Sequence, residues 1–290
     1  MEVIRIIYKK IKIKKIKTNK VLLYAAMIIL VAFTSLPLVY MVSTAFKPLD
    51  ELFLFPPRFF VRHPTLQNII NLLTAMSSSD VPFTRYVFNS IVITVLNVLG
   101  TVIISSMGAY ALSKLEIRAA NKIFPIIVAS LMFSPHVTGI PAYIVVNMLK
   151  LTNTYWAVIL PKLAISYNFF LIKQFADQIP EEILEAARVE GAGEWAVYSK
   201  IAMPMMKPAV STLVVFSFIS NWNDYFGPLV YLNNQAMKTL PLAIQAIGAS
   251  IARAGAMSAA AFLTTLPTIL VYVFMQSRVL KTMAYSGIKA

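Results

Sequence analysis

The feature that most constrains this chain is a series of long apolar stretches that are almost free of charged residues. An α-helix needs about 20 apolar residues to cross the hydrocarbon core of a membrane. Six stretches near or above that length cover residues 21–46, 86–113, 123–149, 155–172, 208–232 and 254–277. The strands of a membrane β-barrel would instead show about 10 residues of alternating polarity. The sequence therefore predicts an all-α membrane protein with six transmembrane helices.

The composition supports this class. Hydrophobic residues make up 58% of the 290 residues and charged residues 13%, whereas soluble domains carry roughly a quarter charged residues. This composition excludes a soluble globular domain of this length. The chain also contains no cysteine, which excludes disulfides and cysteine metal sites.

Basic residues at the ends of the stretches predict the orientation, because lysine and arginine concentrate in cytoplasmic segments. Residues 1–20 contain eight of them, against the single acid Glu2. Six crossings return the C-terminus to the same side, and the basic residues in 114–122 and 278–289 agree with this. We predict cytoplasmic N- and C-termini, with a basic tail that contacts anionic lipid and not nucleic acid.

The chain is therefore divided into a basic cytoplasmic tail (1–20), a first transmembrane helix (21–46), an extracellular segment (47–85) and a core transmembrane domain (86–290). The extracellular segment contains prolines and a run of three serines, which favour turns. It is interpreted either as a passive connector or as a docking surface for an extracellular partner.

The third stretch is interrupted near its middle by Pro135, Gly139 and Pro141. Proline removes a backbone donor and kinks a helix, and lipid tolerates such a break only where protein or water satisfies the freed carbonyls. We expect this helix to bend inside the bundle. His136, beside the kink, is interpreted either as a structural histidine or as a pathway residue.

The polar segment 177–208, between the fourth and fifth stretches, is predicted to be cytoplasmic and to form two short helices. Pro180 suits a first helical turn, and the acids Glu181 and Glu182 suit the positive end of the helix dipole. Gly191 and Gly193 then permit a sharp turn. A compact helix–turn–helix of this kind is shaped to fit a groove of a partner, although an ordinary loop remains the alternative.

The same segment resembles a known motif. Glu185-Ala186-Ala187 is followed by three residues and Gly191, then by nine residues, Ile201, one residue and Met203-Pro204. This spacing is similar to the EAA loop of permease subunits in binding-protein-dependent ABC importers, with methionine at the usual leucine position. Further segments resemble the maltose-permease-like, carbohydrate-uptake branch: 47–68, 153–156, 222–228, 239–242 and 287–290.

The resemblance implies a role for each motif residue. Glu185 would pair with a basic group on a cytoplasmic ATPase, Ala186 and Ala187 would allow close packing, and Gly191 would allow the turn, with Ile201 and Pro204 completing the motif. The implied partners are a second homologous permease, two ATPase subunits that bind ATP and Mg, an extracellular solute-binding protein and membrane lipid. The implied location is the bacterial cytoplasmic membrane.

No catalytic or cofactor-binding constellation is present in the chain itself. It lacks the G-x-x-x-x-G-K-[ST] pattern that cradles ATP phosphates. It also lacks metal-ligand spacing, since His63 and His136 are its only histidines. We therefore expect a transport subunit that is not an enzyme and holds no cofactor, with hydrolysis performed by a separate polypeptide.

The candidate substrate pathway is the outer part of the fifth stretch, where aromatic faces and hydrogen-bonding groups occur together. Such groups suit the C–H faces and hydroxyl edges of a sugar. The alternative is that Trp and Tyr anchor the helix end at the lipid headgroups, and that Asp224 caps the helix. The candidate residues are Asn221, Trp222, Asn223, Asp224 and Tyr225, with Asn168 in the fourth stretch.

Three rival functions remain open at this point. A secondary transporter driven by protons or sodium commonly uses acidic or histidine relays and internal repeats, but the six stretches contain one acid, Asp224, and no clear repeat. An ABC importer for a solute other than a sugar is the second, and a membrane enzyme or scaffold subunit is the third. The sequence names neither the sugar nor the partner chains.

Overall fold

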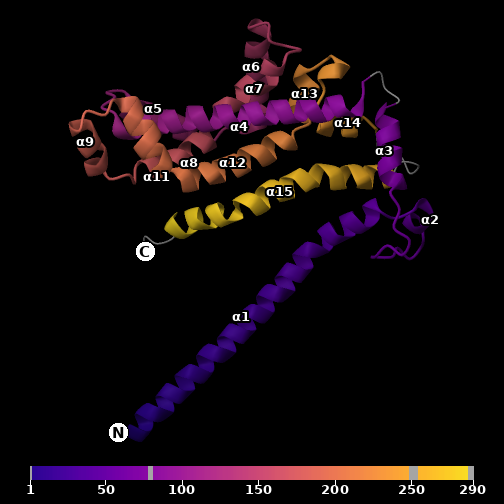
Figure 1. Cartoon of the computed structure of the whole chain (residues 1–290), viewed down its shortest axis with the longest axis horizontal. Helices are drawn as coiled ribbons and strands as arrows, with labels where there is room; N and C mark the ends of the chain where they lie inside the picture. Colours follow the sequence, from indigo (N-terminus) through magenta and orange to yellow (C-terminus); the bar gives the residue numbers. More distant parts are fainter. Residues whose placement is uncertain (1, 78–80, 248–253, 287–290) are drawn as a thin grey trace. The chain divides into compact units, whose positions relative to one another are not determined.

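The computed structural model describes residues 2–77, 81–247 and 254–286. The side chains of residues 2–19, 77, 135–136, 247 and 278–286 lie outside this description. The described chain consists of helices and short connections, without a β-strand (Figure 1). In chain order the elements are α1 (Glu2–Ala45), α2 (Leu49–Leu52), α3 (Gln67–Ser77), α4 (Phe83–Lys114), α5 (Ala120–Ser130), α6 (Pro135–Met148), α7 (Tyr155–Leu163), α8 (Ser166–Ala176), α9 (Glu181–Val189), α10 (Glu194–Val197), a π-helical turn η1 (Tyr198–Ala202), α11 (Met203–Met205), α12 (Lys207–Trp222), α13 (Phe226–Tyr231), a 3-10 turn η2 (Gln235–Met237), α14 (Leu240–Ile247) and α15 (Ala254–Ser286).

The described residues form two compact units. The first comprises those of Met1–Leu72 and Ala249–Phe262, and the second comprises those of Leu73–Gly248 and Leu263–Ala290. The boundary between the units lies inside α3, whereas the sequence placed the start of the core domain at residue 86. Each unit is described by itself below.

Three helical segments in the described residues are long and apolar enough to cross a membrane: Lys20–Ala45, Phe83–Lys114 and Ala254–Ser277. Two bent pairs of helices pass the same test, which raises the number to five if each pair is one crossing. The first pair, α7 with α8, is bent by 42°, and the second, Glu194–Met205 with α12, by 77°. Of the six predicted stretches, 21–46, 86–113 and 254–277 have a helix long enough to cross by itself, and 155–172 has one if α7 and α8 form one crossing. The second bent pair begins at Glu194, before the predicted fifth stretch at residue 208.

The predicted third crossing is where the structure differs. Residues 123–149 are divided between α5 and α6, which are separated by a turn ending at Ser134. Each is too short to span a membrane alone. The break coincides with Pro135, which begins α6 because proline suits a first helical turn and cannot continue a preceding ladder. The expected interruption is present as a complete break, and the side chain of His136 lies outside the described residues.

Two helices have ends that the apolar stretches do not mark, although the first apolar span, Lys20–Ala45, agrees with the predicted 21–46. The basic tail and the first crossing form one helix, α1, because the apolar and basic residues of 2–20 are all helix-compatible. The fifth stretch ends as a helix at Trp222, and α13 resumes at Phe226. Residues 223–225 between them carry the side chains that the pathway prediction emphasised.

The second unit is organised around α4, which packs against α7, α8 and α12 (Figure 1). The buried face of α4 is polar and recurs every three or four residues: Asn89, Ser90, Thr94, Asn97, Thr101, Ser105 and Ser106. Its exposed face carries large apolar side chains such as Phe88, Leu99 and Ile103. A helix packed in lipid is expected to place small and polar residues against neighbouring helices and apolar residues on its outer face.

The first unit folds the chain tightly after α1. The carboxylate of Glu51 accepts hydrogen bonds from the backbone N–H of Arg62 and of His63, each at 3.0 Å. Asn68 donates to the carbonyls of Ala45 (3.1 Å) and Lys47 (2.7 Å). The hydrogen bond from the backbone N–H of Arg62 lowers the pKa of Glu51, although burial of the carboxylate acts in the opposite direction. The segment after α1 is therefore a defined structure and not a loose connector.

Candidate substrate pocket and coupling segment

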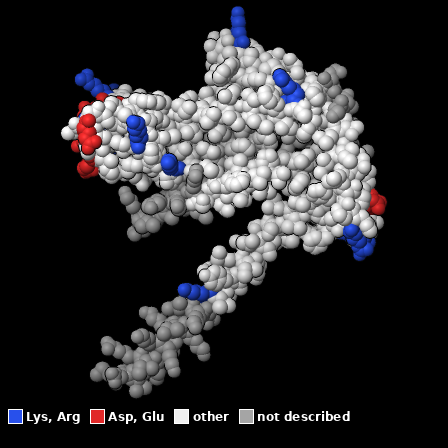
Figure 2. Space-filling model, in the orientation of Figure 1, with Lys and Arg blue, Asp and Glu red and all other residues white. Residues whose placement is uncertain are grey.

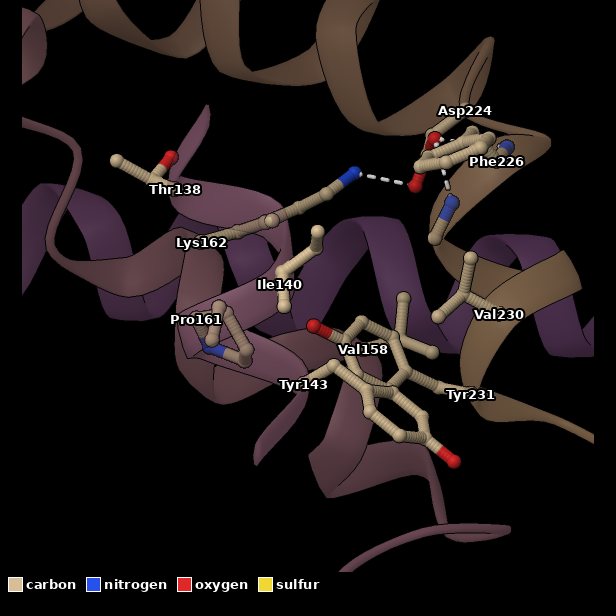
Figure 3. Close-up of a pocket in the computed structure, with 13 residues that line it drawn as sticks. Thr138, Ile140, Tyr143, Val158, Pro161, Lys162, Asp224, Phe226, Val230 and Tyr231 are labelled. Carbon is tan, nitrogen blue, oxygen red and sulfur yellow. Dashed lines mark hydrogen bonds and ion pairs between the residues drawn. The ribbon is translucent and has the colours of Figure 1, made fainter. Parts of the chain in front are cut away.

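The second unit contains a pocket of about 680 Å³. Figure 3 shows that its walls come from α6, α7 and α13 together with the turn that precedes α13. The lining residues are Thr138, Gly139, Ile140, Ala142, Tyr143, Val158, Pro161, Lys162, Asp224, Phe226, Gly227, Val230 and Tyr231. A volume of this size is in the range of small-molecule sites.

A charged pair marks one side of the pocket. The Nζ of Lys162 on α7 lies 2.6 Å from Oδ2 of Asp224 (Figure 3), and their side chains are 22% and 17% exposed. The other carboxylate oxygen, Oδ1, accepts from the backbone N–H of Phe226 and of Gly227, each at 3.1 Å. Asp224 therefore accepts from the first backbone N–H groups of α13 and also lines the pocket.

Gly227 makes this arrangement possible. A Cβ at this position would lie 2.5 Å from Oδ2 of Asp224, a distance that no real side chain tolerates. With glycine the carboxylate approaches the α13 backbone closely while it also meets Lys162. An ammonium has three donors, and within the described part of the chain Lys162 uses one of them, on Asp224. The remaining donors are available to a molecule in the pocket.

The opposite side of the pocket is aromatic. The rings of Tyr143 and Tyr231 stack with centroids 6.0 Å apart and planes inclined by 21° (Figure 3). Phe226, 59% exposed, adds another ring beside the charged pair. Aromatic faces next to charged and hydroxyl groups match a ligand that presents both apolar C–H faces and hydroxyl edges.

The other predicted pathway residues lie elsewhere. Trp222 is buried and its Nε1–H donates to the carbonyl of Thr264 on α15 at 2.9 Å. Asn221 is also buried and donates to the carbonyl of Ser217, while Asn223 donates to that of Ile219. Tyr225 is 42% exposed and Asn168 is buried on α8. Among the described residues that line the pocket, Asp224 is the one member of the predicted set.

Sequence reasoning missed Lys162, Tyr143 and Tyr231. The signal for Lys162 was present, since it is the sole charge in the fourth stretch and ionisable residues within a membrane are functional candidates by default. No signal marked the two tyrosines, because residues 88 positions apart are brought together only by folding.

Residues 177–208, called the coupling segment after the role that the motif resemblance implies, form two helical parts with a turn between them. α9 ends at Val189, and Gly191 follows with a φ of +87°. The second part continues through α10, η1 and α11 and ends at Met205. Pro204 lies two residues beyond the end of the π-helical turn η1, and the helical part ends at the next residue, Met205.

The motif residues occupy two faces of this segment. Glu185, Ala186, Gly191 and Pro204 are exposed, whereas Ala187 and Ile201 are half-buried and pack on the core beside the fully buried Leu184. The carboxylate of Glu185 forms no ion pair with any residue that the structure describes. Figure 2 shows acidic side chains gathered at the end of the unit that carries α9. The exposed face is therefore acidic and free to meet a partner.

Comparison with known proteins identifies relatives along nearly the whole chain. Residues 16–281 match the model of a family described as "Binding-protein-dependent transport system inner membrane component". Protein LplC of Bacillus subtilis is 30% identical over 278 residues, covering 89% of this chain and 90% of LplC. The arabinooligosaccharides transport system permease protein AraQ of Halalkalibacterium halodurans is 29% identical over 260 residues, covering 87% of this chain and 90% of AraQ.

A solved structure has the same fold. It is a crystal structure of a bacterial ABC transporter involved in the import of the acidic polysaccharide alginate, and one of its chains superposes with a TM-score of 0.77. The match covers 90% of this chain and 96% of that chain at 22% sequence identity.

Proposed function

The chain belongs to the family of binding-protein-dependent transport system inner membrane components, and from this premise we propose that it forms part of the import pathway for a sugar or oligosaccharide. The observation that carries the proposal is the family match over residues 16–281. The substrate class rests on relatives named for sugar transport, among them AraQ and the lactose transport system permease protein LacG of Rhizobium radiobacter.

The proposed assembly is a bacterial membrane complex in which this chain pairs with a second, homologous permease. A solute-binding protein delivers the sugar from outside, and two ATPase subunits bind ATP and Mg on the cytoplasmic side. This arrangement explains why the chain needs no phosphate-binding loop of its own. In the proposed orientation both termini of this chain and the coupling segment are cytoplasmic.

Glu185 is the proposed contact with the ATPase. Its carboxylate is exposed on α9 and unpaired within the described part of the chain, so a basic group on a partner can bind it without breaking an internal ion pair. Ala186 beside it has a small side chain, which lets a partner surface approach the helix. Closure of the ATPases on binding ATP would then displace α9.

The pocket between α6, α7 and α13 is the proposed place where this subunit meets the sugar. Lys162 and Asp224 would hydrogen-bond hydroxyl groups, and Tyr143 with Tyr231 would pack on a sugar face. Both charges persist in a membrane-spanning region because each neutralises the other. A pair without net charge suits a polar ligand, whereas an unpaired charge would favour an ion.

Of the rival functions, an ion-coupled transporter is not favoured. Within the described residues the membrane-spanning region offers one acid on the pocket, Asp224, and it is engaged by Lys162 and by two backbone N–H groups. A proton or sodium relay would need acceptors that are free to exchange their partner. Import of a solute other than a sugar remains the alternative that the substrate assay must address.

The experiment is a purification of the tagged chain in mild detergent, followed by mass spectrometry and an ATPase assay. We expect a second permease and an ATPase to co-purify. Glu185→Lys should reduce the bound ATPase at least about tenfold, because it places like charges opposite each other. Glu190→Lys, which changes an exposed acid at a position that the motif leaves unspecified, is the matched control and should retain the ATPase.

Two outcomes would contradict the proposal. Recovery of the chain without any ATPase would argue against the importer itself. Equal retention of the ATPase by wild type and by Glu185→Lys would leave the importer standing and remove the role of Glu185.

A further inference from the structure

The side chain of Arg188 holds the coupling segment onto the end of α4. We propose that Arg188 is a positioning residue for coupling: it makes α9, α10 and α4 move as one body, so that α4 carries displacement of the coupling segment to α7 and its pocket. This inference rests on the proposed function, since it assumes that an ATPase acts on the coupling segment.

Arg188 lies between two acids and a carbonyl. Its Nε is 2.8 Å from Oε1 of Glu194 at the start of α10, and its Nη1 is 3.1 Å from Oε1 of Glu181 at the start of α9. Its Nη2 donates to the carbonyl of Lys114, the last residue of α4, at 3.3 Å. One planar guanidinium thus joins three helices, which a lysine ammonium cannot do in the same geometry.

The partners of Arg188 are themselves attached to α4. The Nζ of Lys114, whose side chain is 8% exposed, lies 3.3 Å from Oε2 of Glu181 and donates to the carbonyl of Ile179 at 2.6 Å. Tyr110, one turn earlier on α4 and 4% exposed, donates to Oε2 of Glu194 at 2.8 Å. We call Tyr110, Lys114, Glu181, Arg188 and Glu194 the clamp.

The clamp is a closed network. It contains two basic and two acidic side chains, and each acid is held from two sides, Glu181 by Lys114 and Arg188, and Glu194 by Arg188 and Tyr110. The hydrogen bond to Glu194 raises the pKa of Arg188 further, so the guanidinium remains charged. Charge-assisted bonds that share members resist separation more than isolated surface pairs do.

Aromatic packing continues the clamp into the core. Tyr198 in η1 stacks obliquely on Tyr110 with ring centroids 5.5 Å apart, and its hydroxyl lies 2.7 Å from Oγ of Ser106 on α4. Tyr198 and Ser106 are both buried. The second part of the coupling segment is therefore fixed to α4 over more than one helical turn.

In the clamp Tyr110 is buried and the side chains of Lys114 and Arg188 are 8% and 28% exposed, whereas those of Glu181 and Glu194 are 43% and 50% exposed at the edge of the coupling segment. Leu184 on α9 is fully buried against the same core, whereas Val189 is 87% exposed and Trp195 is 66% exposed. A partner that contacts the exposed face would not need to touch Arg188. Arg188 can therefore act on α4 without belonging to the docking face.

α4 connects the clamp to the pocket helix. Its 32 residues correspond to roughly 48 Å of helix. Far from the clamp, Ile93 of α4 packs with Val158 and Ile159 of α7, and Asn89 accepts from the hydroxyl of Tyr155 at 2.7 Å. Because Lys162 of the pocket is on that same helix α7, displacement of α4 acts on one wall of the pocket.

The test uses the complete importer reconstituted with its own ATPase and solute-binding protein, and Arg188→Met as the variant. ATP hydrolysis without the binding protein should be unchanged, since docking is preserved. In Arg188→Met the stimulation of ATP hydrolysis by the binding protein should fall at least about fivefold, which is the lower end of typical coupling between two sites. Arg188→Lys should restore part of the stimulation, because it keeps the charge and one hydrogen bond.

A distance measurement reports on the clamp directly. The chain has no cysteine, so spin labels can be placed at Glu190→Cys and Ile103→Cys, both exposed positions in the second unit. We expect one narrow distance distribution, the same without nucleotide and with ATP and vanadate. Arg188→Met should broaden it. Tyr110→Phe, which removes one hydroxyl and disturbs folding least, should broaden it to a smaller extent.

The control is Lys200→Met, which removes an exposed cation of the same segment that has no ion pair among the described residues. Full stimulation and a narrow distance in Arg188→Met would overturn the clamp. Loss of the ATPase from Arg188→Met would also overturn it, because Arg188 would then be a docking residue. Absence of any ATPase from the wild-type complex would refute the proposed function instead.

Discussion

The turn at Gly191 offers a prediction whose size follows from the backbone alone. Its φ of +87° lies in a region that side chains with a Cβ rarely adopt, yet a Cβ there would meet no atom within 4 Å. Gly191→Ser should therefore cost about 1–2 kcal/mol through the backbone and nothing through steric overlap. Such a cost opens the turn more often by a factor of about 5–30.

The comparison with Gly193 isolates this effect. Gly193 has an ordinary φ of −69° as the N-cap of α10, and a Cβ there also meets nothing within 4 Å. Gly193→Ser should be neutral or slightly stabilising, because serine is a favoured N-cap. At position 191, Gly191→Leu should cost no more than Gly191→Ser, and Gly191→Asn should cost less, since asparagine tolerates positive φ.

The assay is amide hydrogen exchange in the purified chain, read on peptides that cover α9 and α10. Exchange should rise in Gly191→Ser and Gly191→Leu by similar factors and remain unchanged in Gly193→Ser. A cost that grows with side-chain volume would refute the reasoning, because it would show that the turn is packed against something. Equal behaviour of the two serine variants would refute it as well.

Three further predictions concern the pocket, the first unit and α4. In a double-mutant cycle of Lys162→Met and Asp224→Asn, thermal unfolding should give a coupling energy of about 1.5–3 kcal/mol, and additivity within about 0.5 kcal/mol would contradict the ion pair. The lowered pKa of Glu51 means that its stabilisation is present above its ordinary value of 4.5 and is lost as the pH falls through the lowered value. The protection factors of the Arg62 and His63 amides, which correct the exchange rate for its intrinsic pH dependence, should therefore fall in acid. In Glu51→Gln these protection factors should not depend on pH, and the same fall in that variant would contradict the role of Glu51. Asn89 donates to the carbonyls of Ala236 and Lys238 and accepts from Tyr155, so Asn89→Leu should destabilise the chain by about 1–3 kcal/mol or more and Tyr155→Phe by less, as measured by unfolding in detergent; equal losses would show that the two carbonyls find other donors.

The local sequence pattern was sufficient to predict the class of protein and the two helical parts of the coupling segment. The apolar stretches predicted α4 and α15 because a helix in lipid must satisfy its own backbone and present apolar side chains outward. Pro180, the acids after it and the glycines of the turn predicted the beginning and end of α9, since each acts through the backbone of its own neighbourhood. The break at Pro135 was located, but whether it bends or divides the helix depends on contacts that the sequence does not list.

What the sequence by itself determined is therefore the helical membrane class, most of the helices and the family motif around Glu185, all of which depend on residues close together in the chain. Only the tertiary structure decided which side chains face one another. It brought Lys162 to Asp224 and Tyr143 to Tyr231, and it turned Trp222 away from the pocket. It also assembled the clamp from α4, α9 and α10, because ion pairs and ring contacts act over a few ångströms in space regardless of separation along the chain.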